Sequence, residues 1–378
     1  MKIAIFHNLP PGGGKRVLYE QVKYLSSVHE THLYETEKQK KFLDAGEFSN
    51  KKYLLNFDLK NRLPGILNRL YKDYKNFIKL NNHHKQISGI IDDGNYDVCV
   101  IHPDRFTQTP FILRYLKTPT LYFCEEYLRI CYEKQLIFNE PVIFYKKWYE
   151  FITRIFRKRI DKTNAMYADK VVANSKYTKE NIDEAYGITS RFCHLGVNAK
   201  IFRKTTDSKR NMILVIGEKD VTGDYPFIKI LSELIKKYGI KIKTLGFSKG
   251  RLEVSDDNIL AGEYSSAIAT VCVSFNEPFG LAPLESMACE TPVLAVNEGG
   301  YRETINDGIT GYLLPREPRV FAKKIIYLLD NPDILKKMGK MGREHVKRYF
   351  TWEKHCKCLE KYLIDVAKDK RVLKNEED

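Results

Sequence analysis

Short apolar runs rich in β-branched residues alternate with longer stretches of helical periodicity along the whole chain. Nearly continuous apolar strands separated by helices are typical of parallel sheets covered on both faces. The runs form two series, one in each half of the chain, which predicts two α/β domains, each a doubly wound parallel sheet. The expected strands are 3–6, 31–34, 97–102, 119–123, 170–175, 212–217, 241–246, 271–275, 291–296 and 311–314.

The length of the chain also favours two domains, because 378 residues exceed what one compact core usually holds. The strand and helix pattern is interrupted at 196–210, where Gly, Asn and charged residues cluster. We therefore expect an N-terminal Rossmann-like domain over 1–200 and a second Rossmann-like domain over 201–350. The last segment, 351–378, is expected to be a helix that begins at Thr351, returns towards the first domain and ends in a frayed tail.

The positive charge is concentrated in two segments of the first half. The chain has 63 Lys and Arg against 48 Asp and Glu, a net charge of +15, which favours an anionic partner. Segments 51–90 and 143–163 contribute +7 and +5, and both interleave the cations with aromatic and aliphatic residues. A basic amphipathic helix suits an anionic membrane surface. Inward packing of the aromatics under a solvated basic face is the alternative. No zinc-finger, RNP-type or KH-type motif accompanies the charge, so we expect no nucleic acid.

The cysteines and the apolar runs indicate a compartment. Eight cysteines are scattered without CxxC or zinc-type spacing, which is typical of a reducing environment. The N-terminal apolar run, 3–6, is too short for a secretory signal, and no run is long enough to span a membrane. We expect a cytoplasmic protein, either free or peripheral on the inner membrane face.

The richest chemical information lies in 271–314, a predicted strand–loop–helix–strand unit. Its loop and the start of its helix, near 281–289, fall at the carboxyl end of a parallel sheet, where such folds bind ligands. Free amides at a helix start bind anions. Glu277 in the loop and Glu285 in the helix can face one ligand, and a carboxylate accepts hydrogen bonds from vicinal hydroxyls. Taken alone, two glutamates beside a helix start also fit a solvated face or partners of the helix dipole, which is the alternative to ligand binding.

The whole stretch resembles the donor-site motif of retaining GT-B glycosyltransferases, particularly family 4 (glycosyl transferases group 1). The residues in register are Glu277, Phe279, Gly280, Glu285, Met287, Ala288, Pro292, Val293, Gly299, Gly300 and Glu303. Weaker similarities cover most of the chain, at 11–16, 168–175, 196–202 and 350–353. The resemblance implies a GT-B fold, in which two Rossmann-like domains face each other across a cleft.

The resemblance also implies an activity of the hexosyltransferase type. A sugar would move from a nucleotide-diphosphate sugar to an acceptor with retention of the anomeric configuration, without a metal and with no cofactor besides the donor. By analogy with the family, Glu277 contacts the donor sugar as a catalytic residue and Glu285 holds the ribose. Backbone amides of Phe279, Gly280 and Leu281 would contact the sugar and the diphosphate.

The glycine-rich loop after the first strand does not fit two common phosphate motifs. A dinucleotide fingerprint would need glycine where Val17 stands, and a P-loop would need Ser or Thr where Arg16 stands. The family resemblance assigns Gly13 and Gly14 to contact with the donor, since glycine lets the backbone approach a ligand closely. A purely structural turn is the alternative.

The chain departs from the family pattern in the second domain. Glu218 stands where the family has Arg, and Thr222 stands where it has Lys. An acid repels a diphosphate, so either Lys219 replaces the missing cations or the donor is held differently. The two replacements are also the strongest argument for a weak or silent member that serves as a binding subunit of an active enzyme.

The first domain also departs from the family, because Glu125 occupies the place of a His near the reacting sugar. We expect Glu125 to be catalytic. His102, Arg105, Glu126 and Arg129 are acceptor-binding candidates, although His102 could be structural and Glu126 and Arg129 could form a helical ion pair. The expected acceptor is a glycan, a lipid-linked sugar or a glycolipid at the cytoplasmic membrane face, as in envelope polysaccharide synthesis. The remaining alternative is a nucleic-acid-binding protein with a Rossmann-like body.

Overall fold

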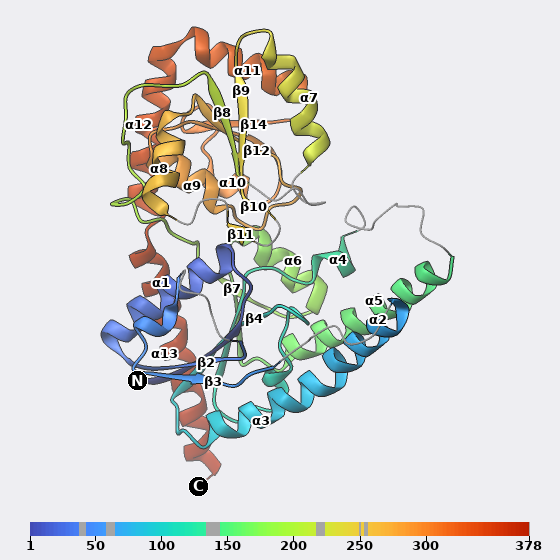
Figure 1. Cartoon of the computed structure of the whole chain (residues 1–378). Coiled ribbons are helices and arrows are strands. Elements are labelled where there is room, and N and C mark those ends of the chain that lie inside the picture. The colour runs from blue at the N-terminus through green and yellow to red at the C-terminus, as the bar shows by residue number, and fades with distance from the viewer. Residues whose placement is uncertain are drawn as a thin grey trace. The chain divides into compact units, whose positions relative to one another are not determined.

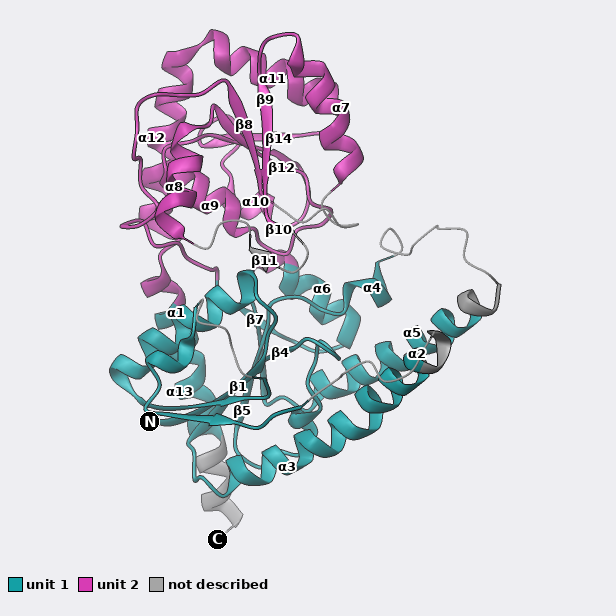
Figure 2. Ribbon diagram, in the orientation of Figure 1, with its two compact units in different colours: residues 1–174, 178–193, 356–378 teal, residues 175–177, 194–355 magenta. Residues whose placement is uncertain are grey.

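The chain forms two compact units (Figure 2). The structure is a computed structural model that describes residues 1–37, 43–57, 65–133, 144–216, 224–248, 251–252 and 256–377. Unit 1 consists of residues 1–174, 178–193 and 356–378, and unit 2 consists of residues 175–177 and 194–355. Apart from residues 175–177, the chain changes units after residues 193 and 355, whereas the sequence predicted boundaries after 200 and 350.

Unit 1 is built on a seven-stranded parallel sheet with the order β3-β2-β1-β4-β5-β6-β7. Its central strands are buried along almost their whole length, as expected for strands covered on both faces. The strands are β1 (Lys2–Asn8), β2 (Glu30–Glu35), β3 (Lys51–Leu54), β4 (Val98–Asp104), β5 (Thr120–Cys124), β6 (Lys170–Ala173) and β7 (Arg191–Phe192).

The helices of unit 1 pack around this sheet (Figure 1). They are α1 (Gly13–Val28), η1 (Ala45–Glu47), α2 (Gly65–Tyr74), the π-helical turn η2 (Lys75–Lys79), α3 (Leu80–Asp92), η3 (Phe111–Arg114), α4 (Arg129–Tyr132), α5 (Phe144–Met166), α6 (Lys176–Tyr186) and α13 (Trp352–Glu377). Helix α13 starts as predicted, since the hydroxyl of Thr351 accepts a hydrogen bond from the Lys354 amide at 3.3 Å. Helix α13 continues to Glu377.

Unit 2 is built on a five-stranded parallel sheet with the order β14-β13-β12-β8-β9. Its strands are β8 (Met212–Ile216), β9 (Lys241–Leu245), β12 (Ala269–Cys272), β13 (Val293–Val296) and β14 (Gly311–Leu314), with a small hairpin of β10 (Phe247–Ser248) and β11 (Arg251–Leu252). Its helices are α7 (Tyr225–Lys236), α8 (Asp257–Ser266), α9 (Leu281–Ala288), α10 (Tyr301–Thr304), α11 (Pro318–Asp330) and α12 (Pro332–Tyr349).

The two parallel sheets confirm the predicted α/β class and its two Rossmann-like halves. All ten predicted strands are present, and the predicted helix near 281–289 is α9. The sequence missed β3, an edge strand with two leading lysines, and the short strands β7, β10 and β11. None of the described helices is both long and apolar enough to cross a membrane.

Candidate functional site

Two glycines after β13 support the loop that carries Glu277. The Gly300 amide donates a hydrogen bond to the Glu277 carbonyl oxygen at 2.8 Å. A Cβ on Gly299, whose φ is +55°, would lie 2.5 Å from that same oxygen, and a Cβ on Gly300 would lie 2.5 Å from the carbonyl oxygen of Pro278. Only glycine therefore fits at either position without moving the loop backbone. Gly299 and Gly300 therefore pack directly against the backbone of the 276–280 loop and support it.

Helix α9 begins directly after this loop, at Leu281. Gly280 is its N-cap, with φ +87° and without a side chain that could satisfy the first amides of the helix. The phenyl ring of Phe279 is buried and stacks on the His194 ring, with 5.7 Å between ring centroids. Leu281 is only half-buried, whereas the helix is buried from Pro283 onward. The uncapped amides and the peptide dipoles give the start of α9 the properties of an anion site.

The two candidate glutamates differ in their surroundings. Glu277 lies half-buried in the loop. Glu285 is buried within α9, and its Oε2 accepts a hydrogen bond from the Tyr264 hydroxyl of α8 at 2.9 Å. Burial and the negative charge of Glu285 hold the pKa of Tyr264 well above its ordinary value, so this hydroxyl remains a donor. Tyr264, which the sequence did not suggest, fixes the orientation of the Glu285 carboxylate.

The third motif carboxylate, Glu303, has a structural task. Its two oxygens accept hydrogen bonds from the amides of Lys176 and Tyr177 at 2.9 and 2.6 Å and from His194 Nε2 at 2.7 Å. Burial raises the pKa of Glu303, but the bonds from His194 and the two amides outweigh burial and hold it below the ordinary value.

Arg316, just after β14, joins several segments at the carboxyl ends of the unit 2 strands. It forms ion pairs with Asp224 at 2.7 Å and Glu298 at 2.6 Å, and Nη1 donates to the Val273 carbonyl at 2.7 Å. Its guanidinium lies 3.8 Å from the centroid of the Phe275 ring. Burial lowers the pKa of Arg316, but hydrogen bonds to the two carboxylates outweigh burial and raise it. Arg316 thus anchors the segment that leads from β12 to Glu277, and no sequence pattern pointed to it.

In unit 1, the structure brings three predicted residues together. A Cβ on Gly14, in the first turn of α1, would lie 2.6 Å from Glu125 Oε2, so this carboxylate fills the space beside the glycine. His102 is fully buried in β4, and its Nδ1 lies 3.9 Å from Glu125 Oε1. Neither ring nitrogen of His102 nor this oxygen has a hydrogen-bond partner in the described part of the chain. Gly13, the residue before Gly14, is exposed at the start of α1.

Other predicted unit 1 residues are engaged elsewhere. Arg105 pairs with Glu37. Arg129 is buried and forms a two-bond ion pair with Glu133, at 2.6 Å from Nε and 3.2 Å from Nη2. Its contact with Glu126, the predicted helical pair, is longer, at 4.0 Å. Arg129 is therefore held mainly by the glutamate four residues on.

A second group of polar side chains surrounds Lys15, the residue after Gly14 in α1. The sequence did not single out Lys15. Lys15 is buried, and burial lowers its pKa despite the attraction of Glu35 and Asp44. Lys52 Nζ lies 3.1 Å from Glu35 Oε2, and His7 Nε2 lies 3.0 Å from Glu35 Oε1. Lys52 thus offsets the charge of the buried Glu35, and His7, whose pKa is lowered by burial, contributes a hydrogen bond and no charge.

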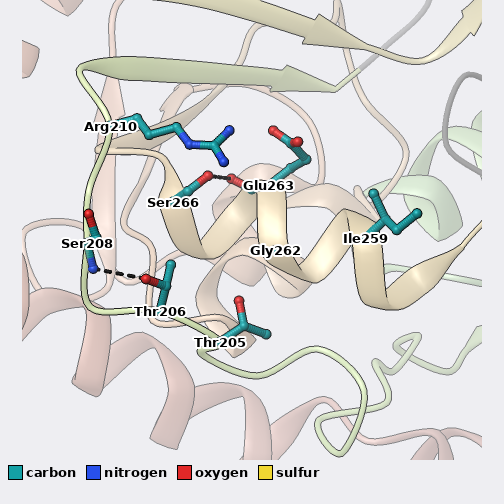
Figure 3. A pocket seen from close by; sticks show the side chains of 8 residues that line it. All are labelled: Thr205, Thr206, Ser208, Arg210, Ile259, Gly262, Glu263 and Ser266. Atoms are coloured by element: carbon teal, nitrogen blue, oxygen red, sulfur yellow. Dashed lines mark hydrogen bonds between the residues drawn. The ribbon is translucent and has the colours of Figure 1, made fainter.

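Lys219, Glu218 and Thr222 lie outside the described residues. No cluster of His, Cys, Asp or Glu with the makings of a metal site occurs within the described ranges. Unit 2 also has a hollow of about 370 Å³, and none of the predicted site residues lines it (Figure 3). It is lined by Thr205, Thr206, Ser208, Arg210, Ile259, Gly262, Glu263 and Ser266. Because it lies between the connection into β8 and helix α8, it is separate from the start of α9.

Residues 199–345 match the family model described as glycosyl transferases group 1. The second unit belongs to this family. A glycosyltransferase of Methanocaldococcus jannaschii, described as uncharacterized, is 28% identical over 207 residues, which cover 50% of this chain and 57% of that protein. The chain therefore spans little more than half the length of this relative.

Solved structures extend the likeness to both units. The sucrose-phosphate synthase of Thermosynechococcus elongatus matches with a TM-score of 0.70 and 18% identity, over 97% of this chain and 99% of that one. An Anabaena protein solved in complex with UDP-glucose matches with a TM-score of 0.67 and 15% identity, over 97% and 100%. At these identities the likeness concerns the fold alone, which is the GT-B class.

Proposed function

We propose that this protein is a retaining glycosyltransferase that moves a hexose from a nucleotide-diphosphate sugar to a glycan, lipid-linked sugar or glycolipid. The observation that carries the proposal is the 276–280 loop, supported by Gly299 and Gly300 and followed by the uncapped start of α9. The Anabaena structure with UDP-glucose supports the class of donor.

In this proposal the donor lies along the start of α9. The amides of Gly280 and Leu281 bind the diphosphate, and the helix dipole offsets part of its charge. Glu277 accepts hydrogen bonds from the sugar hydroxyls. Glu285, held by Tyr264 at 2.9 Å, accepts hydrogen bonds from the ribose hydroxyls.

During the reaction, the bond between the anomeric carbon and the diphosphate oxygen breaks, and a bond to the acceptor oxygen forms on the same face. The acceptor hydroxyl gives its proton to the departing diphosphate oxygen, on which negative charge develops as the bond to the sugar breaks. Donors already aimed at that charge contribute on the order of 3 kcal/mol each. We propose that no metal and no cofactor besides the donor takes part. In unit 1, Glu125 stabilises the positive charge on the sugar, and Gly13 and Gly14 allow close approach of the ligand.

We further propose that the protein works as a peripheral protein at the cytoplasmic face of a membrane. The cationic segments 51–90 and 143–163 support this location.

One sequence feature favours a second candidate function, a catalytically silent binding subunit. Glu218 and Thr222 stand where the family resemblance expects two cations that grip the diphosphate. A donor-binding protein without turnover would fit these replacements.

Thermal unfolding in the presence of UDP-, GDP- and ADP-sugars tests the proposal. A donor at about 100 times its Kd adds about 2.7 kcal/mol of stability, which raises the Tm by roughly 5 °C or more. Glu285→Gln should lose most of this shift, and Tyr264→Phe should lose part of it. If no nucleotide sugar stabilises the wild type, the proposal fails. Stabilisation without any transfer or hydrolysis favours the silent subunit, and NMR of a product's anomeric configuration tests retention.

A further inference from the structure

Helix α5 exposes an apolar stripe. Its members are 46–59% exposed and are Trp148, Phe151, Ile152, Ile155 and Phe156. The spacing of these positions places them on one face of the helix, the pattern that normally marks the side packed against a core. We call these five residues the α5 stripe. Met166, three turns beyond Ile155, is 58% exposed and continues the same face.

The buried face of α5 is polar. Asp161 is fully buried and accepts hydrogen bonds from the Thr109 hydroxyl at 2.6 Å and the Tyr186 hydroxyl at 2.7 Å. The side-chain amide of Asn164, also buried, donates to the Thr109 carbonyl at 2.7 Å, and its oxygen accepts from Arg114. Rotation of the helix to bury the α5 stripe would break these hydrogen bonds and leave the polar groups that make them without partners. The orientation of α5 is therefore fixed with its apolar side outward.

A neighbouring helix shows a similar pattern. Leu70, Tyr74 and Ile78, four residues apart along α2 and η2, are each about half exposed, at 48–51%. Asp73 on α2 accepts hydrogen bonds from Arg157 Nη2 at 3.0 Å and from the Tyr149 hydroxyl, so the two helices are tied side by side (Figure 1). Two joined helices thus present apolar side chains to the outside.

The charge around the α5 stripe identifies the kind of partner. Helix α5 carries seven Lys and Arg and only two acids. One of the acids, Asp161, is buried, whereas Lys158, Arg159 and Lys162 are exposed. Arg159 and Lys162 follow Ile155 by four and seven positions, so they continue its face. An apolar stripe followed by cations on the same face matches an anionic lipid surface, which offers an apolar interior beneath a negative headgroup layer.

We propose that α5 lies in the plane of an anionic membrane, with the α5 stripe inserted below the headgroups and Lys158, Arg159 and Lys162 at the lipid phosphates. This inference specifies the membrane location named in the proposed function. It rests on exposure and charge and not on the transferase chemistry, so each can fail without the other.

Tryptophan fluorescence and co-sedimentation test the proposal with the full chain. The chain has two tryptophans, so Trp352→Phe leaves Trp148 as the reporter. Vesicles of phosphatidylcholine with phosphatidylglycerol should bind the protein and shift Trp148 emission to the blue, and phosphatidylcholine alone should bind it much more weakly. Phe151→Ser and Ile155→Ser should each weaken partitioning about tenfold, because each removes apolar area from the membrane interface. Ile259→Ser, at a residue 58% exposed in unit 2, is the matched control and should partition like the wild type.

Other outcomes would overturn the inference. Failure to bind anionic vesicles, or binding that the two stripe variants leave unchanged, excludes the α5 stripe as the contact. A dimer in solution that dissociates in the Phe151→Ser variant would assign the stripe to a second copy of the chain. Binding to an oligonucleotide in preference to vesicles would assign it to nucleic acid. Nucleotide-sugar titration of the same variants should match the wild type, which separates failure here from failure of the proposed donor site.

Discussion

Gly299→Ala tests whether the conformation of the 276–280 loop depends on the close packing of Gly299 against its backbone. The substitution has two costs. An alanine at φ +55° costs about 1–2 kcal/mol in backbone strain. The new Cβ would also lie 2.5 Å from the Glu277 carbonyl oxygen and 2.9 Å from the Glu277 nitrogen, which are backbone atoms that can yield only if the loop moves.

Gly308→Ala is the matched control, because Gly308 in the same unit has φ +73° and its Cβ would meet nothing within 4 Å. It carries the backbone strain without the collision. We expect Gly308→Ala to lose about 1 kcal/mol of unfolding free energy and to bind a nucleotide sugar like the wild type.

Gly299→Ala should be less stable than this control, and its donor affinity should fall by tenfold or more. Displacement of positioned groups by about 1 Å costs on the order of 100-fold in rate, so turnover should fall further than affinity. Chemical denaturation measures the first effect and calorimetric titration the second. Equal donor affinity in the two alanine variants would refute the role of Gly299 as support for the loop.

Three further predictions concern residues that hold the units in shape. Arg316→Met should cost about 3 kcal/mol of stability and weaken donor binding, because it leaves Asp224 and Glu298 without their partner. Chemical denaturation measures the loss of stability, and calorimetric titration measures the donor affinity. An unchanged donor affinity would contradict the anchoring role of Arg316. Glu303→Ala should lower the Tm by several degrees, because two amides and His194 lose their acceptor; an unchanged Tm would contradict this. Burial raises the pKa of the Asp161 carboxyl to about 6 in the folded protein, above its value of 3.8 in the unfolded chain. Protonation of Asp161 therefore stabilises the folded state fully below pH 4, and this stabilisation is lost as the pH rises through 6. Asp161→Asn should remove this part of the pH dependence, on the order of 2–3 kcal/mol, and parallel stability–pH curves for the variant and the wild type would refute it.

The sequence predicted the sheets because their strands are apolar on both faces, a pattern that few elements other than buried parallel strands show. It also placed the start of α9 correctly, at Leu281, because the turn residues before it and Pro283 in its first turn mark a helix beginning. The sequence did not predict β3, because an edge strand needs no apolar face. It did not predict β7, because a strand of two residues shows no periodicity.

The sequence did not predict which residues the charged side chains pair with. Arg129 pairs with Glu133 more closely than with the nearer Glu126, and Arg105 pairs with Glu37 from a distant part of the chain. Helix α5 shows a deeper limit. Its apolar periodicity identifies one face of the helix, but the polar contacts of Asp161 and Asn164 decide that this face points outward. Inward packing of the Trp148 and Phe151 side chains, the alternative that the sequence left open, is not what the structure has.

Backbone amide chemical shifts measured during titration with UDP-glucose and the matching GDP- and ADP-sugars test the donor site most directly. If a nucleotide sugar binds at the start of α9, the amide signals of Gly280 and Leu281 shift with the titration, while those of Thr206 and Ser208 in the separate hollow stay in place. Saturable shifts at the hollow with none at Gly280 or Leu281 would contradict the assignment of the donor to this helix.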